Sequence, residues 1–202
     1  MIFDVVCFAL SGFFMKFSDE AIDVKNNKNL GIFADVICVV FTLLVSVVNG
    51  DAACIFLSIL IGTALSNKVD SINHIIAAIL FIILLVIIGF PEFSWLCLII
   101  CIIANLIDEY GNDKYDEKIE KNSNVSETLL DKFFKYRCAL KVTVLVLSLL
   151  GLVNVLFNNT IISGIMFFQP TTFILLYIFD LSYEIAGVSF DRIYNIFQSF
   201  FG

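Results

Sequence analysis

Side chains with carboxylate or amide oxygens recur four residues apart at the ends of two apolar stretches of this sequence. Asp19 and Asp23 follow the first stretch, and Asp108 and Asn112 follow the fifth, with Asp113 next to them. Residues four apart share one face of a helix, so each pair directs its oxygen atoms the same way. Carboxylate oxygens suit Mg²⁺, which often holds substrate phosphates as well. These five residues are our predicted metal ligands, and solvated helix ends are the alternative interpretation.

Two basic residues are candidates for binding the phosphate of a substrate, Lys68 and Arg137, because both lie in connections expected on the same side of a membrane. Together with the acids they predict a Mg²⁺-dependent enzyme that acts on a lipid-linked phosphate or diphosphate at the cytoplasmic face. The sequence has no glycine-rich phosphate loop and no His-Glu-x-x-His motif. The catalytic residues, the substrate and the reaction stay unassigned.

The two acidic segments resemble the aspartate motifs of the UbiA-type intramembrane prenyltransferases. The segment 18–27, Ser-Asp-Glu-Ala-Ile-Asp-Val-Lys-Asn-Asn, is similar to the first motif, and 108–114, Asp-Glu-Tyr-Gly-Asn-Asp-Lys, is similar to the second with one residue inserted. In that family both motifs are cytoplasmic, four helices apart. The resemblance implies that the aspartates hold Mg²⁺ and the diphosphate of a prenyl donor.

The elements that must position these residues are membrane helices. Hydrophobic residues make up 60% of the 202 residues and charged residues only 15%, whereas soluble domains carry about 25% charged residues. Backbone groups in lipid must be satisfied within their own segment, which favours α-helices. We therefore predict an all-α, polytopic transmembrane helical bundle that forms a single integral membrane domain, residues 1–202.

Seven apolar stretches are long enough, or nearly long enough, to be spans of roughly 17–25 residues. They are Ile2–Phe17, Leu30–Asn49, Ala52–Ser66, Ile75–Phe90, Phe93–Ile107, Cys138–Phe157 and Ile161–Phe179. Pro170 is expected to kink the last of them. Two further amphipathic segments are predicted to lie on the membrane surface or against the bundle. One precedes the sixth span, with Leu129, Leu130, Phe133 and Phe134 on one face, and the other is at the C-terminus, with a stripe from Phe190 to Phe201.

The distribution of lysine and arginine predicts the orientation of the chain. All 12 basic residues fall in or beside alternate connections, and the connections at Gly50-Asp51, Pro91-Glu92 and 158–160 have none. Cytoplasmic loops carry the excess of Lys and Arg. Seven spans then put every basic residue in the cytoplasm, with the N-terminus outside and the C-terminus inside a cell membrane.

Other functions remain open at this stage. A small transporter or ion-conducting protein needs polar groups deep in its spans, and Asp35, inside the second span, is the clearest one. A non-catalytic membrane subunit is the third possibility. The net charge of −7 argues against nucleic acid as a partner, which leaves membrane lipid as the expected one, and the oligomeric state is not indicated. The six cysteines form no Cys-x-x-Cys pair, so we expect free thiols.

The orientation can be tested with reporter fusions along the chain. Fusions after Asp51, Glu92 and Asn159 should report the outer side, and fusions after Asn27, Ser71 and Asn122 the cytoplasm, because the basic residues segregate under a seven-span count. A cytoplasmic signal from the Glu92 fusion would contradict this topology.

Overall fold

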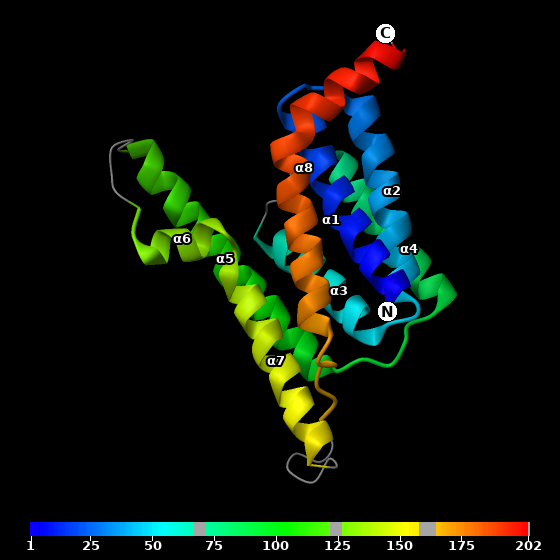
Figure 1. Cartoon of the computed structure of the whole chain (residues 1–202), viewed down its shortest axis with the longest axis vertical. Coiled ribbons are helices and arrows are strands. Elements are labelled where there is room, and N and C mark those ends of the chain that lie inside the picture. The colour runs from blue at the N-terminus through cyan, green and yellow to red at the C-terminus, as the bar shows by residue number, and fades with distance from the viewer. Residues whose placement is uncertain (67–71, 122–126, 158–164, 202) are drawn as a thin grey trace. The chain divides into compact units, whose positions relative to one another are not determined.

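The computed structural model describes residues 1–66, 72–121, 127–157 and 165–201, without the side chains of residues 72, 73 and 197–201. These described residues form eight α-helices and no strand (Figure 1). The helices are α1 (Ile2–Asp23), α2 (Lys28–Ser46), α3 (Gly50–Leu65), α4 (Ile72–Ile88), α5 (Trp95–Lys121), α6 (Leu129–Lys135), α7 (Cys138–Leu156) and α8 (Thr172–Phe201). The all-α class predicted from the sequence is confirmed.

Four helices in the described part of the chain are long and apolar enough to cross a membrane. They are Lys28–Ser46, Trp95–Lys121, Cys138–Leu156 and Thr172–Ile196. The apolar helices α3 and α4 are shorter, with 16 and 17 residues, or about 24–26 Å at 1.5 Å per residue, against a hydrocarbon core of about 30 Å. In α1, Asp4 and Lys16 leave only a short apolar stretch between them. The membrane helical protein is thus supported, and the count of seven spans stays a prediction.

The last predicted span and the C-terminal segment need correction. Residues 165–171 are not helical, and residues 161–164 lie outside the described residues. Pro170 therefore precedes a helix instead of kinking one, in keeping with its missing N–H and fixed φ. The helix that follows, α8, has 30 residues and includes the predicted C-terminal amphipathic segment. That segment is the end of α8 and not a separate surface helix.

Asparagine side chains begin the two helices that follow α1. The Asn27 side-chain oxygen accepts a hydrogen bond from the Leu30 N–H at 3.2 Å, and the Asn49 oxygen accepts from Asp51 and Ala52 at 3.0 and 3.2 Å. The first N–H groups of a helix have no partner within it, so a side-chain acceptor there stabilises the start. These caps explain why α3 follows α2 after a turn of only a few residues.

Contacts divide the chain into two compact units. Unit 1 comprises Met1–Val48, Ser71–Phe90 and Ile174–Gly202, and unit 2 comprises Asn49–Asp70 and Pro91–Phe173. The single domain predicted from the sequence stays a prediction. All six cysteines are free thiols, as expected.

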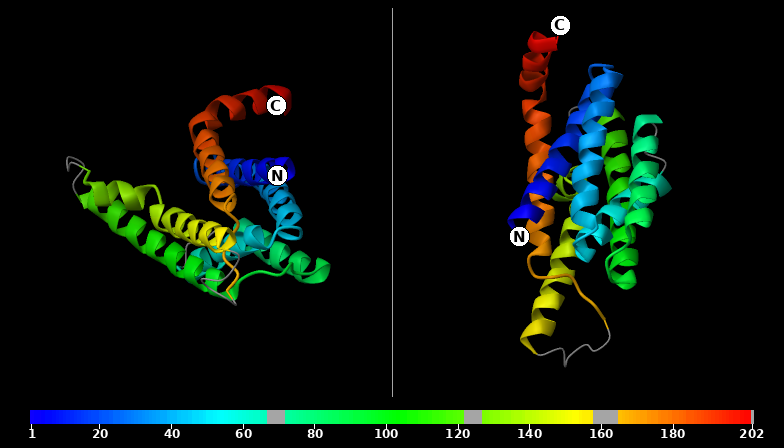
Figure 2. Two further views of the ribbon diagram at one scale, coloured as in Figure 1. Left: turned by 60° about the horizontal axis from the view of Figure 1, so that its bottom comes forward. Right: turned by 90° about the vertical axis from the view of Figure 1, so that its right-hand side faces the viewer.

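Unit 1 is built around the antiparallel pair of α1 and α2, which lie side by side in Figures 1 and 2. The Ser18 hydroxyl donates to the Gly31 carbonyl at 3.0 Å and links the two helices. A cluster of buried residues fills the space beside this link: Phe17, Ala21, Ala34, Phe190 and Tyr194. Helix α4 packs on α2, and α8 contacts α1 where Gly12 meets the backbone of Phe179.

In unit 2, α5 is the central helix and contacts α3, α6 and α7. The Asn105 amide of α5 donates to the Ile59 carbonyl of α3 at 3.2 Å. An Asp51 carboxylate oxygen accepts from the Gln169 N–H at 2.7 Å and from the Thr172 hydroxyl at 2.6 Å. Asp51 therefore ties the segment before α8 to the start of α3.

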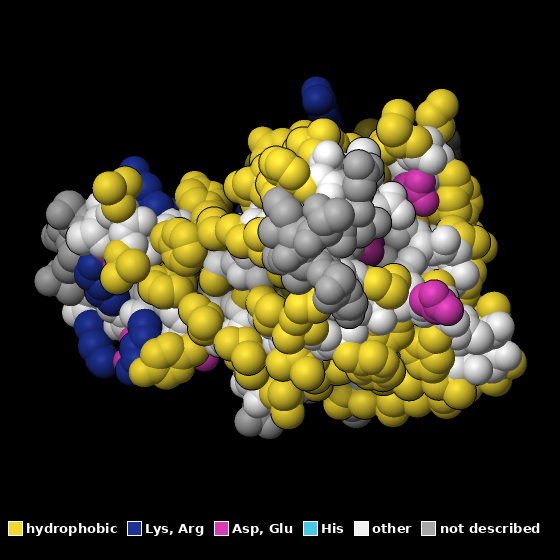
Figure 3. Space-filling view, turned by 90° about the horizontal axis from the view of Figure 1, so that it is seen from below, with side chains coloured by type: hydrophobic (Ala, Val, Ile, Leu, Met, Phe, Trp, Pro, Cys, Tyr) yellow, Lys and Arg dark blue, Asp and Glu magenta, His cyan; other side chains and the backbone are white. Residues whose placement is uncertain are grey.

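Large hydrophobic side chains are exposed in both units, and many are visible in the end view of Figure 3, where lysine and arginine gather on one side. Soluble monomers rarely expose continuous apolar surface beyond a few hundred Å². A lipid environment for the helices accounts for this surface.

The contact between α1 and α8 provides a stability test. A methyl group at Gly12 would overlap the Phe179 carbonyl group, so Gly12→Ala should lower the free energy of unfolding by roughly 1–3 kcal/mol, as overpacking does. At Gly187, also within a helix of unit 1, the nearest atom to an added methyl is Cε of the flexible Lys16 side chain, at 3.1 Å. Thermal unfolding in detergent should therefore show a loss for Gly12→Ala and none for Gly187→Ala. Equal melting temperatures for the two variants would contradict this packing.

Candidate functional site

Four helices of unit 1 bring polar side chains together around the only histidine of the chain. His74, at the start of α4, has its Nε2 atom 3.4 Å from Oδ1 of Asp19 on α1. Its Nδ1 atom lies 3.4 Å from Oδ1 of Asp35 on α2. The Tyr183 hydroxyl of α8 donates to Oδ2 of Asp19 at 3.1 Å. We refer to Asp19, Asp35, His74 and Tyr183 as the histidine cluster.

Asp35 is the most enclosed member of the histidine cluster. It lies in the candidate span Lys28–Ser46 and is 7% exposed. Its Oδ2 atom is buried and has no hydrogen-bond partner among the described residues. A pocket of about 90 Å³ lies beside it, and the other lining residues are apolar side chains of α2 and α4. A carboxylate in such surroundings is costly and marks function more often than packing.

The geometry of His74 limits what the histidine cluster can bind. Asp19 and Asp35 face different nitrogen atoms of the imidazole ring, and these nitrogens point away from each other. Both carboxylates and the ring therefore cannot converge on one ion while the ring keeps this orientation. Among the described residues, no group of three or more His, Cys, Asp or Glu side chains is arranged to hold a metal ion.

The N–O distances of 3.4 Å are longer than the usual 2.7–3.2 Å of a hydrogen bond. A small movement of the ring shortens one contact and lengthens the other. On the outer side of the cluster, Lys16 pairs with Glu20 at 2.8 Å and lies over the Tyr183 ring at 5.4 Å. The arrangement is thus a row of titratable groups, with Asp35 at the enclosed end and Asp19 beside charged residues.

In unit 2, the acidic residue Asp108 has a structural role. Asp108 is fully buried, and its two oxygens accept hydrogen bonds from the Ala139 and Leu140 N–H groups at 2.8 and 2.7 Å. The residue before α7, Arg137, has a positive φ of 47° and offers no side-chain cap. Asp108 of α5 supplies the missing cap, and its negative charge suits the positive end of the helix dipole.

The other predicted site residues, for metal and for substrate, lie in separate surroundings. Arg137 pairs with buried Glu109 at 3.4 Å, and the Asn112 amide donates to Asp116 at 2.9 Å. Asp23 and Asp113 are exposed, while Lys68 lies outside the described residues. Asp19 and Asp23 belong to unit 1 and Asp108, Asn112 and Asp113 to unit 2, so a site shared by the two groups stays a prediction.

Sequence reasoning identified Asp19 and Asp35 separately and did not connect either of them to His74. The available signal was a lone histidine at the start of an apolar stretch, together with a carboxylate inside the neighbouring one. Comparisons with known proteins add no further information: no protein-family model, curated protein or solved structure matches the chain.

The role of Asp108 can be separated from metal binding. Asp108→Ala removes both acceptors at the start of α7 and should cost about 1–2 kcal/mol of stability, as loss of a helix cap does. Asp108→Asn, which keeps one acceptor oxygen, should lose less. Thermal unfolding in detergent should show the same differences in EDTA and in Mg²⁺.

Glu120→Gln provides the control, because Glu120 is an exposed acid on the same helix and its replacement should leave the melting temperature unchanged. A ligand bound by the folded state raises the melting temperature as its concentration rises. Stabilisation of the wild type by Mg²⁺ that disappears in Asp108→Asn would therefore identify Asp108 as a metal ligand and contradict a purely structural role.

Proposed function

We propose that this chain is a small membrane transport protein that moves protons through the histidine cluster of Asp19, His74 and Asp35. The observation that carries the proposal is the position of His74, with one carboxylate 3.4 Å from each ring nitrogen. Asp35 lies within a candidate span, and chains of Asp, Glu and His that reach into membrane segments are the groups from which proton pathways are built. The proposal takes up the transport alternative that Asp35 raised in the sequence.

Imidazole suits a relay because it accepts a proton at one nitrogen and releases another from the second. In the proposed step, protonated Asp35 gives its proton to Nδ1 of His74, which becomes a cation held between two carboxylates. The Nε2 proton then passes to Asp19. Asp35 is left as a carboxylate, Asp19 as a carboxylic acid and His74 as a neutral ring protonated at Nδ1. One proton has moved from α2 to α1. The cycle closes when Asp19 releases its proton, Asp35 takes up another, and the ring returns to its Nε2-protonated tautomer by proton exchange.

A proton fits the histidine cluster better than a metal ion because the two carboxylates lie at different edges of the ring. Tyr183 holds the second oxygen of Asp19 at 3.1 Å and keeps the first directed at His74. The Oδ2 atom of Asp35, which no described residue contacts by a hydrogen bond, is a position where a proton can be held. Under the seven-span orientation in a cell membrane, the ends of α1 and α4 that carry Asp19 and His74 are cytoplasmic.

Proton flux into liposomes tests the proposal. Purified protein is reconstituted with a pH-sensitive dye inside, and a potassium gradient with valinomycin drives proton entry. The wild type should acidify the lumen faster than empty liposomes do. His74→Gln and Asp35→Asn should lower the rate by about 100-fold or more, because each removes a proton-exchanging group from the pathway. Asp19→Asn should lower it as well.

Glu184→Gln is the matched control, since Glu184 is an exposed acid on α8 near Tyr183, and this variant should keep the wild-type rate. Melting temperatures of all variants show whether the fold is retained. A wild-type rate equal to that of empty liposomes would overturn the proposal. A well-folded His74→Gln variant with full flux would also overturn it and leave the histidine cluster with a structural role.

A Mg²⁺-dependent enzyme, in the manner of the UbiA-type prenyltransferases, is a second proposal with less support. It needs Asp19 and Asp23 to share an ion with residues of unit 2, and Asp108 would have to give up its hydrogen bonds to α7. Of the predicted metal ligands, Asp23 and Asp113 are exposed. The Mg²⁺ titration of the Asp108 variants distinguishes this proposal from the proton pathway.

A further inference from the structure

Helix α6 presents two leucine side chains with no cover from the described residues. Leu129 is 88% exposed and Leu130 is 64% exposed. The sequence suggested one apolar face for this segment, and the structure divides it between two environments. Phe134 packs on α5 so closely that a methyl group at Gly111 would overlap its ring. The phenylalanine side holds α6 in place, and the two leucines point elsewhere.

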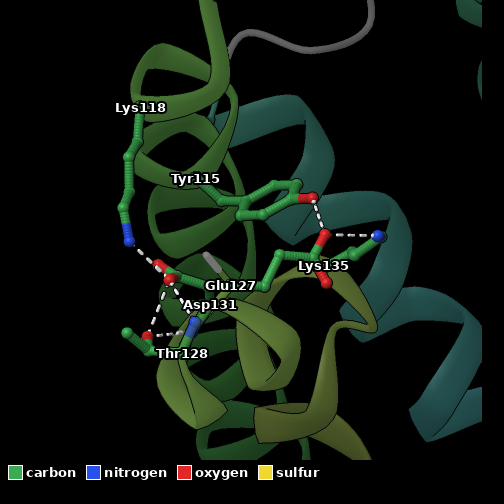
Figure 4. Close-up of polar contacts among 6 residues, drawn as sticks. All are labelled: Tyr115, Lys118, Glu127, Thr128, Asp131 and Lys135. Carbon is green, nitrogen blue, oxygen red and sulfur yellow. Dashed lines mark hydrogen bonds and ion pairs between the residues drawn. The ribbon is translucent and has the colours of Figure 1, made fainter. Parts of the chain in front are cut away.

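Polar contacts hold α6 firmly against α5 (Figure 4). Thr128 and Asp131 form a capping box at the start of α6, and Lys118 of α5 pairs with Asp131. This lysine, together with Thr128, lowers the pKa of Asp131 to about 2, so the carboxylate stays ionised at neutral pH. The leucines are therefore displayed on a braced helix and do not belong to a loose loop.

A second group of contacts braces the other side of the hairpin between α5 and α6. Glu127 accepts a hydrogen bond from the Tyr115 hydroxyl at 2.6 Å and pairs with Lys135 at 2.7 Å. The Lys135 ammonium and the Tyr115 hydroxyl lower the pKa of Glu127, so this carboxylate too is ionised at neutral pH. Both acids of the α6 segment are thus compensated by lysines.

The position of α6 along unit 2 is close to a membrane boundary. It ends at Lys135, and the candidate span α7 begins at Cys138. Three residues reach at most about 10 Å, so α6 cannot be far from the level where α7 enters the lipid. Tyr110 and Tyr136 are 67% and 48% exposed near this level, and exposed tyrosines are enriched where spans meet the headgroups.

The charges beside the leucines indicate what kind of surface lies there. Lys114 and Lys132 are exposed, and neither forms an ion pair with another described residue. Apolar side chains near exposed lysines suit anionic phospholipid, in which leucines reach the boundary between headgroups and acyl chains while lysines meet the phosphates.

We propose that α6 is an interfacial anchor that inserts Leu129 and Leu130 into the surface of the membrane that α7 crosses, with Lys114 and Lys132 at anionic headgroups. The anchor is independent of the proton pathway, since its residues belong to unit 2 and the histidine cluster belongs to unit 1. By fixing α6 at the membrane boundary, the anchor sets the depth at which α7 enters the lipid. The start of α7 is the helix end that Asp108 caps.

Tryptophan fluorescence in brominated lipid tests the anchor on the full chain. The only native tryptophan is Trp95, so Leu130→Trp is made together with Trp95→Phe and reconstituted in vesicles of phosphatidylcholine and phosphatidylglycerol. Emission should be shifted to the blue, and lipids with bromine near the top of the acyl chains should quench it. Glu120→Trp with Trp95→Phe is the control, and its emission should stay red-shifted and unquenched.

Replacing phosphatidylglycerol by phosphatidylcholine should reduce the quenching of Leu130→Trp, because the lysines then lose their anionic partners. Unquenched red-shifted emission from Leu130→Trp would place the leucines in water and overturn the proposal. Blue-shifted emission without quenching would also overturn it, since a second copy of the chain or another protein would then cover α6. Proton flux measured on the same vesicles is expected to persist, so failure of the anchor is distinguishable from failure of the pathway.

Discussion

Each carboxylate that enters an apolar part of this protein needs a donor, and the contacts between helices are built around that need. Asp108 takes the first N–H groups of α7, which a helix start leaves free. Asp51 takes the Gln169 N–H before α8 and the hydroxyl of Thr172, the first residue of α8. An ionised carboxylate without such partners costs several kcal/mol in an apolar environment, so these acids determine which helix ends meet within unit 2.

The histidine cluster departs from this pattern in a way that favours function. Asp19 and Asp35 share a single imidazole at 3.4 Å on each side, and one oxygen of Asp35 has no partner within the described part of the chain. A structural site would satisfy that oxygen, as Asp108 satisfies both of its own. Loose and incomplete contacts around a titratable ring are what proton exchange requires, because each transfer has to make one contact and break another.

The α5–α6 hairpin, which precedes the candidate span α7, also pairs its carboxylates with donors and leaves apolar side chains exposed. The two acids of the α6 segment are paired with lysines, Phe134 packs against α5, and the two leucines remain exposed. The same seven-residue helix is therefore rigid on one side and lipid-compatible on the other. The pair of exposed Arg137 and buried Glu109 and the cap of α7 follow within a few residues of the end of α6.

The sequence by itself determined the helices, because long apolar runs in lipid have no other way to satisfy their backbone. Most predicted spans match observed helices to within a few residues, apart from the polar extensions of α1 and α5. It did not determine the start of α8, where Pro170 and the hydrogen bond from Thr172 to Asp51 displaced the expected helix.

The sequence also did not distinguish the helix caps from the candidate sites. Asp19 and Asp108 have the same helical spacing to their neighbours, yet one faces His74 and the other caps α7. Local pattern specifies which face of a helix a carboxylate occupies, whereas the donor it meets belongs to another helix far along the chain, and only tertiary packing decides that.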